Sequence, residues 1–173
     1  HLVRVVALTP EPSRRSPLFT KQLDRCLRQG IECIEVTDAK SALECLELRP
    51  ASVLVDALFG IGLRGRLESP FSEVVEYMNS INRAPVVSLD CPSGLDCDRG
   101  VVAESGVCVR ASMTITFGLI KPGFLISDGP QFVGKVRRCN IGFPEAAHRA
   151  CANSTFAFGE RLARRSLPRW DRT

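Results

Sequence analysis

Two aspartates in this sequence lie at the ends of short apolar runs, a position that suits them to bind a ligand. Asp56 comes at the end of residues 51–57 (A-S-V-L-V-D-A), and Asp90 ends residues 85–90 (P-V-V-S-L-D). Runs of this length and composition predict buried strands. The carboxyl ends of parallel strands share one edge of a sheet, and ligands of open α/β sheets bind beyond that edge. We therefore expect both carboxylates to face a ligand.

The segment between the two acids carries glycines in the pattern G-x-G-x-x-G, at Gly60, Gly62 and Gly65. This pattern is the fingerprint of a Rossmann dinucleotide site. The fingerprint places its third glycine in the first turn of a helix, whereas Ser69-Pro70 predicts a helix that begins later. We therefore favour a longer free loop, whose backbone amides and one arginine face a pyrophosphate. A tight turn without a ligand is the other interpretation.

The second acid opens the turn D-C-P-S-G-L-D at residues 90–96. Pro92 and Gly94 restrict this turn, and we expect it to present the Asp90 carboxylate and the Ser93 hydroxyl to the ligand crevice. The alternative is an aspartate that only caps its own turn. Ser93 is not expected to be a nucleophile, because there is no G-x-S-x-G elbow and both histidines lie near the ends of the sequence.

A lysine in a turn bracketed by glycine and proline is the third feature. Lys121 lies in F-G-L-I-K-P-G, residues 117–123, in a sequence whose basic residues are mostly arginine. It either contacts a phosphate or is a solvated turn lysine. The sequence alone favours neither.

Four segments in a fixed order carry a family pattern. They are V-D-A-L-F-G-I-G-L-R-G (55–65), D-C-P-S-G-L-D (90–96), T-F-G with K-P-G (116–123) and N-I-G-F-P (140–144). From its start to about Pro144 the sequence resembles the YjeF N-terminal domain family, the NAD(P)H-hydrate epimerases. The resemblance implies an isomerase that interconverts the S and R forms of hydrated NAD(P)H, called NAD(P)HX, in nicotinamide nucleotide repair.

The resemblance also implies roles for individual residues. Asp56 and Ser93 would help to bind a potassium ion, and their oxygen atoms suit a hard cation. Asp90 would contact the substrate. We expect it to be the acid–base residue too, because the ion would hold Asp56 ionised and unable to donate a proton. The other expected substrate-binding residues are Gly60, Ile61, Gly62, Leu63, Arg64, Gly65 and Arg66.

The sequence departs from the family pattern in three ways. Cys91 stands where an aliphatic residue is usual, and Ile61 stands where a small hydroxyl residue is common. The family's phosphate loop, of the G-N-N-G-G-D-G type, would precede the region in which this sequence begins. We therefore expect the chain to lack the N-terminal strand and the phosphate loop of the fold. By itself it should bind and turn over dinucleotide poorly.

The elements that must position these residues alternate between strands and helices. Strands are predicted over 2–8, 31–36, 51–57, 85–90, 113–117 and 133–140, and helices from Ser16-Pro17 to Gly30, over 39–46 and from Ser69-Pro70 to 78. Such alternation is typical of βαβ units. The expected fold class is α/β, a three-layer Rossmann-like sandwich with a mostly parallel sheet.

Composition and charge narrow the choice of partners. The net charge of +4 is concentrated in residues 160–173, so the rest of the chain is close to neutral and no nucleic acid is expected. No apolar run reaches the roughly 18 residues of a membrane span, and we expect no signal peptide, because the first residues show no charged head followed by a long apolar core. The eight cysteines show no C-x-x-C pair, and we interpret them as reduced residues of a cytoplasmic protein.

The expected organisation is an epimerase domain over residues 1–158 and a basic linker over residues 159–173. The linker would lead to a dehydratase domain that uses ADP or ATP, and a homodimer is a further candidate assembly. One alternative is a non-catalytic scaffold or binding domain of the same family, which would have no use for Asp56, Asp90 and Ser93. The other is a Rossmann dehydrogenase, which the position of the helix start disfavours.

Overall fold

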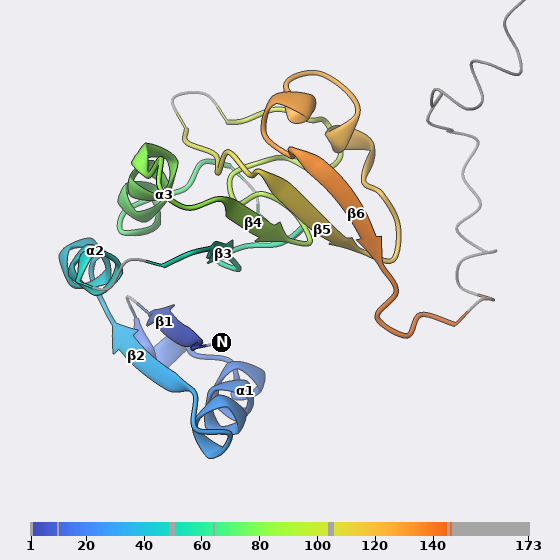
Figure 1. The fold of residues 1–173 in the computed structure, drawn as a ribbon. Coiled ribbons are helices and arrows are strands. Elements are labelled where there is room, and N and C mark those ends of the chain that lie inside the picture. The colour runs from blue at the N-terminus through green and yellow to red at the C-terminus, as the bar shows by residue number, and fades with distance from the viewer. Residues whose placement is uncertain are drawn as a thin grey trace, which may run out of the picture. The chain divides into compact units, whose positions relative to one another are not determined.

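The computed structural model describes residues 2–9, 11–48, 51–63, 65–103, 106–144 and 146. The chain divides into two units, residues 1–139 and 140–173, and the helices and strands named below belong to the first (Figure 1). Arg64, the predicted end of the domain at residue 158 and the predicted linker over 159–173 lie outside the described residues.

The described residues form six strands in two sheets (Figure 1). One sheet pairs β1 (Arg4–Leu8) with β2 (Glu32–Val36). The other has the order β3 (Leu54–Asp56), β4 (Val86–Leu89), β5 (Met113–Phe117) and β6 (Lys135–Cys139). Every pairing between these strands is parallel, which confirms the predicted fold class. Both β1 and β3 are edge strands: β1 pairs only with β2, and β3 pairs only with β4, among the described strands. The strands therefore form two separate sheets.

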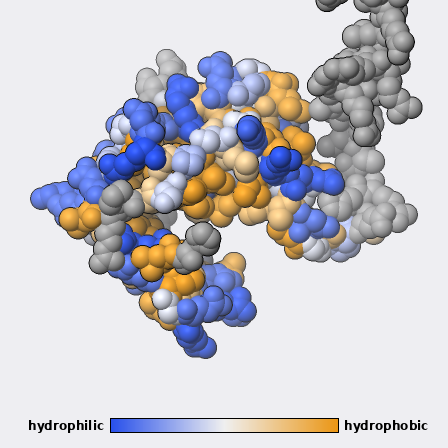
Figure 2. Space-filling model, viewed as in Figure 1, coloured by the Kyte–Doolittle hydropathy of each residue, from blue (hydrophilic) through white to orange (hydrophobic). Residues whose placement is uncertain are grey.

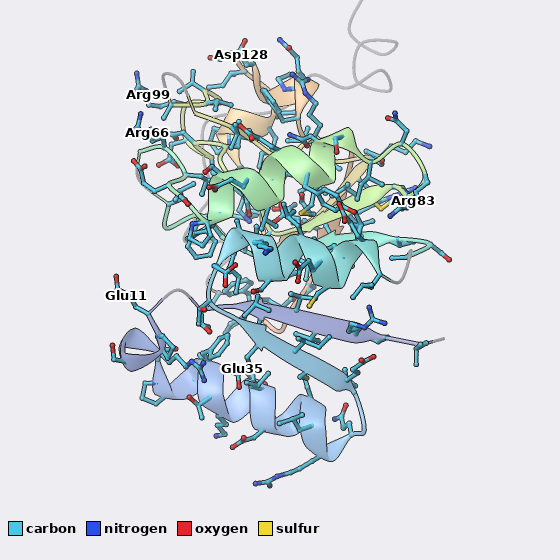
Figure 3. All side chains as sticks on the ribbon, turned by 90° about the vertical axis from the view of Figure 1, so that its left-hand side faces the viewer. Glu11, Glu35, Arg66, Arg83, Arg99 and Asp128 are labelled. Carbon is cyan, nitrogen blue, oxygen red and sulfur yellow. A yellow bond between two sulfur atoms is a disulfide. The ribbon has the colours of Figure 1, made fainter. Side chains whose placement is uncertain are left out.

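Helices α1 (Pro17–Arg28) and α2 (Ala39–Glu47) cover opposite faces of the β1–β2 sheet (Figures 1 and 3). The start of α1 is as predicted: the Ser16 hydroxyl accepts a hydrogen bond from the Phe19 amide at 3.1 Å, and Pro17 occupies the first helical position. Gly30 follows the end of the helix, also as predicted.

Helix α3 (Phe71–Ser80) begins one residue later than the sequence suggested. Pro70 is its N-cap residue, and the Ser69 hydroxyl donates to the Glu73 carboxylate at 2.7 Å instead of capping the helix. The Ser69 and Ser72 hydroxyls lower the pKa of Glu73. The glycine-rich loop thus ends well before a helix starts, which agrees with the argument against a Rossmann fingerprint.

Two hydrophobic clusters hold the unit together. The larger joins α2 and α3 to the strands, and includes Val36, Ala42, Leu54, Val74, Val75, Met78 and Val86. The smaller lies around the turns that follow β4 and β5, and includes Cys91, Leu95, Cys97, Cys108, Phe124 and Val133. Apolar side chains are also exposed, as Figure 2 shows for one face; among them Val55 of β3 is 55% exposed. In the described part of the chain, no helix has the length and apolar character to cross a membrane.

Candidate functional site

Asp56 and Ser93 join the ends of β3 and β4. The Asp56 side chain is fully buried. Its Oδ1 accepts a hydrogen bond from the Ser93 hydroxyl at 2.6 Å, and its Oδ2 accepts one from the Ser93 amide at 2.9 Å. The Ser88 hydroxyl (2.8 Å) and the Leu58 amide (3.3 Å) donate to the same carboxylate. Hydroxyl and amide dipoles therefore stabilise this buried group, which has no ion-pair partner within the described residues.

Ser93 also fixes the beginning of the glycine-rich loop. Its Oγ accepts a hydrogen bond from the Phe59 amide at 3.0 Å and lies 3.3 Å from the Phe59 carbonyl oxygen. The Phe59 ring packs edge-on against Phe71 of α3, with ring centroids 4.8 Å apart. The backbone that enters the loop is therefore held by both the β4 turn and α3.

The loop itself is open in its first half and anchored further on. Gly60, Ile61 and Gly62 are exposed, whereas the Leu63 side chain packs against the larger core. Leu63 can therefore offer a ligand its backbone more readily than its side chain. A Cβ atom at Gly60 would lie 3.5 Å from Asp90 Oδ2, so the start of the loop lies beside that carboxylate.

Arg66 is paired rather than free at the end of the loop. Its Nε donates to the Glu68 carboxylate at 2.8 Å, and both side chains are largely exposed. Figure 3 shows Arg66 at the outside of the fold. The hydrogen bond and the charge of Glu68 raise the pKa of Arg66. A phosphate would have to compete with Glu68 for this guanidinium.

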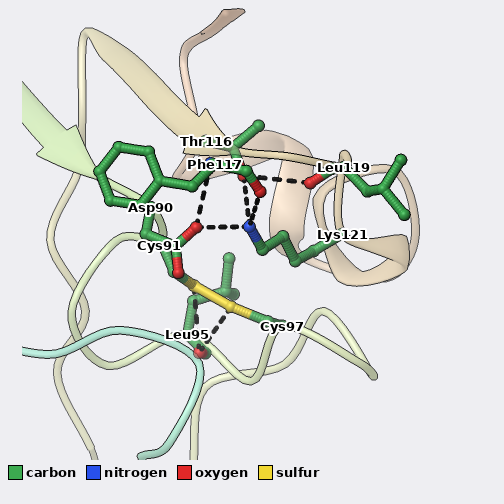
Figure 4. A network of polar contacts seen from close by, with 8 residues as sticks. All are labelled: Asp90, Cys91, Leu95, Cys97, Thr116, Phe117, Leu119 and Lys121. Atoms are coloured by element: carbon green, nitrogen blue, oxygen red, sulfur yellow. Dashed lines mark hydrogen bonds and ion pairs between the residues drawn. A yellow bond between two sulfur atoms is a disulfide. The ribbon is translucent and has the colours of Figure 1, made fainter. Parts of the chain in front are cut away.

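Asp90 has an unusual backbone conformation directly after β4. Its φ of 66° lies in the left-handed region, which aspartate tolerates better than most residues with a side chain. Its amide still donates to the Ile115 carbonyl of β5 at 2.8 Å. Its Oδ1 accepts a hydrogen bond from the Phe117 amide at 3.1 Å and forms an ion pair with Lys121 (Figure 4). Such conformations persist only where the surroundings enforce them, and they cluster at functional sites.

The turn after Asp90 is as restricted as its sequence predicted. Gly94 has a φ of 103°, and a Cβ atom there would lie only 2.2 Å from the Val107 carbonyl oxygen. The Val109 amide donates to the Ser93 carbonyl at 2.9 Å. The loop begins beside both residues, since the Phe59 amide donates to the Ser93 hydroxyl and Asp90 Oδ2 faces Gly60, but the Ser93 side chain itself is buried.

A disulfide between Cys91 and Cys97 spans this turn (Figure 4). The expectation that all the cysteines are reduced is wrong for this pair. The fold of the turn brings together two side chains that do not form a C-x-x-C pair in the sequence. Cys26, Cys33, Cys45 and Cys108 are free thiols. Burial, and secondarily the charge of Asp56, raise the pKa of the Cys108 thiol to about 12.

Sequence reasoning assigned no role to two polar residues of the site, Ser88 and Thr116, although Thr116 belongs to one of the family segments. Ser88 lies within β4 and holds Asp56, and Thr116 lies within β5 and accepts a hydrogen bond from Lys121 at 2.8 Å. Both are completely buried. A hydroxyl residue in a buried apolar strand needs a hydrogen-bond partner, and this requirement could have identified both. The structure also excludes a solvated Lys121, whose side chain is only 14% exposed.

The family model described as YjeF-related protein N-terminus matches residues 1–123. A bifunctional NAD(P)H-hydrate repair enzyme Nnr from Thermofilum pendens is 39% identical over 143 residues, which cover 82% of this chain and 26% of the relative. The Nnr of Pyrobaculum aerophilum is 40% identical over 129 residues, or 72% and 25% of the two chains. An NAD(P)H-hydrate epimerase from Limosilactobacillus fermentum is 38% identical over 89 residues, or 51% and 41%.

The aligned part of the chain therefore spans only about a quarter of the two bifunctional relatives. The crystal structure of the yeast protein ynu0 (YNL200c) has the same fold, with a TM-score of 0.65 at 17% identity over 92% of this chain and 74% of the yeast chain. Because the family match covers well over half of its residues, the chain belongs to the YjeF-related N-terminal family.

Proposed function

We propose that this chain is an NAD(P)H-hydrate epimerase domain, an isomerase that interconverts the S and R epimers of NAD(P)HX. The names of relatives that are 38–40% identical support this activity. The structural observation that carries the proposal is the position of Asp90. Its carboxylate lies beside the start of an exposed glycine loop, with Oδ2 3.5 Å from where a Gly60 side chain would begin.

The glycine-rich loop would bind the dinucleotide. Its proposed contact residues are Gly60, Ile61, Gly62, Leu63, Arg64, Gly65 and Arg66. Phe59 and Leu63 anchor the first half of the loop at both ends, while the backbone between them is exposed. Exposed amides on a fixed backbone can donate to a pyrophosphate with little loss of conformational entropy.

Asp90 would be the acid–base residue. The lone pair of the ring nitrogen can expel the hydroxyl group, which takes up a proton and leaves as water, so that a flat iminium forms. Water then adds to the other face and gives up a proton. A carboxyl group that donates and retrieves this proton would accelerate both halves, typically by roughly 10²–10⁴-fold. Asp56 suits the task less well, because it is fully buried and four protein donors occupy its oxygens.

The substitution Asp90→Asn, made in the full-length protein, tests this role. It should preserve the fold and the substrate affinity to within a few-fold, and should lower the rate of epimer interconversion by roughly 10²-fold or more. The rate is followed by chromatography of the two epimers against the spontaneous background. Asp98→Asn, which changes an exposed aspartate on the same connection, is the matched control and should keep the wild-type rate.

Two results would contradict these assignments. If Asp90→Asn kept the wild-type rate while Asp56→Asn lost it and retained the ion, the roles of the two acids would be wrong. If the wild-type protein did not exceed the background rate, the non-catalytic scaffold of the same family would be the better interpretation.

We also propose that Asp56 and Ser93 help to bind a potassium ion. The described residues contain no group of three or more His, Cys, Asp or Glu side chains suited to a metal. Three oxygens nevertheless converge, since Ser93 Oγ lies 2.6 Å from Asp56 Oδ1 and 3.3 Å from the Phe59 carbonyl oxygen. A buried carboxylate, a hydroxyl and a carbonyl suit a hard cation, and the cation would balance the charge of Asp56. Bound there, it would stabilise the loop entrance.

Thermal unfolding distinguishes this ion from a general salt effect. Potassium chloride should raise the melting temperature more than choline chloride at the same ionic strength, and Asp56→Asn should abolish the difference. Asp98→Asn should leave it unchanged. An equal response to both salts in the wild-type protein would rule out the potassium site.

Repair of NAD(P)HX needs a second activity, because epimerisation only converts one hydrate into the other. We propose that a dehydratase that uses ADP or ATP consumes the product. Its fusion to this domain is consistent with the bifunctional relatives. Residues 1–158 as the domain, 159–173 as a linker, the homodimer and the cytoplasmic location stay predictions.

A further inference from the structure

Lys121 has a fully occupied set of hydrogen-bond donors. Its Nζ donates to Thr116 Oγ1 at 2.8 Å and to the Phe117 carbonyl at 3.1 Å, and it pairs with Asp90 Oδ1 (Figure 4). An ammonium group has three N–H donors and no acceptor, so these three partners use all of them. Lys121 therefore has no donor left for a phosphate, and its partners all lie within the protein.

The fold fixes the backbone from which Lys121 extends. The adjacent 3-10 helix η2 (Pro122–Phe124) rests on the turn that follows Asp90, where the Gly123 amide donates to the Cys97 carbonyl at 2.8 Å. A Cβ atom at Gly123 would lie 2.6 Å from that carbonyl oxygen, so only glycine allows this approach. The turn that begins with Asp90 therefore supports the backbone next to Lys121, and the Lys121 side chain contacts Asp90 itself.

The consequence for Asp90 is a fixed orientation of its carboxylate. Lys121 and the Phe117 amide both hold Oδ1. Within the described residues nothing donates to Oδ2, the oxygen that faces Gly60. Rotation of the carboxylate would break two contacts at once, and one of them is charge-assisted. One oxygen is therefore bound to the protein, and the other is left to face the loop.

We propose that Lys121 is a positioning residue for the epimerase reaction, an inference that rests on the function proposed above. It orients Asp90 so that Oδ2 faces the substrate, and it does not touch the substrate itself. Small displacements of a reacting group can cost about 10²-fold in rate, so the loss of Lys121 should be seen in kcat and not in KM.

The substitution Lys121→Met, made in the full-length protein, removes the charge and the donors at similar length. It should lower kcat by roughly 30-fold or more and leave KM within about threefold. Lys121→Ala should recover part of its rate in propylamine, which replaces the missing atoms and the ammonium group. Lys135→Met, an exposed lysine of β6, is the matched control. Thr116→Val keeps the side-chain volume, removes one acceptor of Lys121 and should lower kcat by a smaller factor than Lys121→Met. If Lys121→Met does not fold, the kcat of Thr116→Val tests the proposal instead, and a wild-type kcat in this variant would count against it.

Hydrogen exchange of the Phe117 amide tests the positioning without an activity assay. This amide donates to Asp90 Oδ1 and should lose protection in Lys121→Met but not in Lys135→Met. If the wild-type protein had no epimerase activity but Lys121→Met still lost protection of the Phe117 amide, the epimerase function would be refuted. The orientation of Asp90 by Lys121 would still hold. A wild-type kcat in a folded Lys121→Met, or a Phe117 amide that stays protected, would overturn the proposal.

Discussion

Ser93 holds Asp56 by its hydroxyl and by its backbone amide, at 2.6 and 2.9 Å from the two carboxylate oxygens. The two residues are 37 positions apart in the sequence; Asp56 is the last residue of β3, and Ser93 follows the neighbouring parallel strand β4. The same hydroxyl accepts from the Phe59 amide, so one serine connects a buried acid, a strand end and the loop entrance. The site is therefore built around a shared polar group, and its parts should respond together to mutation.

Ser93→Ala should release the loop entrance as well as destabilise the fold. It leaves the partly buried Phe59 amide without its partner and removes two hydrogen-bond contacts of the Ser93 hydroxyl, so we expect a loss of about 1–3 kcal/mol in the free energy of unfolding. Ser88→Ala removes another hydroxyl from the same carboxylate but leaves Phe59 bound. Urea unfolding should show a loss in both variants. The Phe59 amide should exchange faster only in Ser93→Ala; equal exchange in both would show that Ser93 does not hold the loop.

Gly60→Ala should disturb catalysis without disturbing the fold. The backbone there does not need glycine, and the new methyl group would lie 3.5 Å from Asp90 Oδ2, in ordinary contact. It would occupy space between the loop and the carboxylate, so kcat/KM should fall about tenfold or more, the effect of a misplaced reacting group. At Gly62 a methyl group meets nothing within 4 Å, and Gly62→Ala should lose less. If Gly62→Ala lost more kcat/KM than Gly60→Ala, the substrate would lie elsewhere on the loop.

Local chemistry explains which elements the sequence could predict. The start of α1 depends on Ser16 and Pro17 alone. The prediction for β5 has the bounds of the strand, because apolar residues alternate with threonine in it. Contacts between distant segments left no such signal. The pairing of Lys121 with Asp90 crosses 31 residues, and the approach of Cys91 to Cys97 depends on how the turn folds. The two-sheet arrangement likewise depends on which strand edges find partners.

The disulfide should make unfolding sensitive to reductant. Closing a loop with a sequence separation of 6 is expected to stabilise the folded state by about 2 kcal/mol, mainly by restricting the unfolded chain. The double variant Cys91→Ala/Cys97→Ala should lose this amount in urea unfolding. Dithiothreitol should lower the urea midpoint of the wild-type protein to that of the variant, and should leave the midpoint of the variant unchanged. Alkylation in urea without reductant, read by peptide mass spectrometry, should leave Cys91 and Cys97 unmodified; if both are modified, the disulfide is absent.

Cys108 should be the least reactive of the four free thiols named above. The thiolate is the reacting species, and a pKa of about 12 leaves roughly 10⁻⁴ of the thiol ionised at pH 8. Its alkylation by iodoacetamide should therefore lag behind that of Cys26, which is only half-buried, and should accelerate about tenfold for each unit of pH.

Two substitutions separate the causes of this low reactivity. Asp56→Asn removes a charge that raises the pKa of Cys108, so labelling should become faster, though only moderately because burial is the larger cause. Replacing Arg110, whose charge lowers the pKa, by Met should slow labelling further. The two variants should thus shift the rate in opposite directions, while the unfolded chain labels equally in all. If both variants accelerated labelling alike, local opening of the fold would control the reaction, and the charge of Asp56 would not act on Cys108.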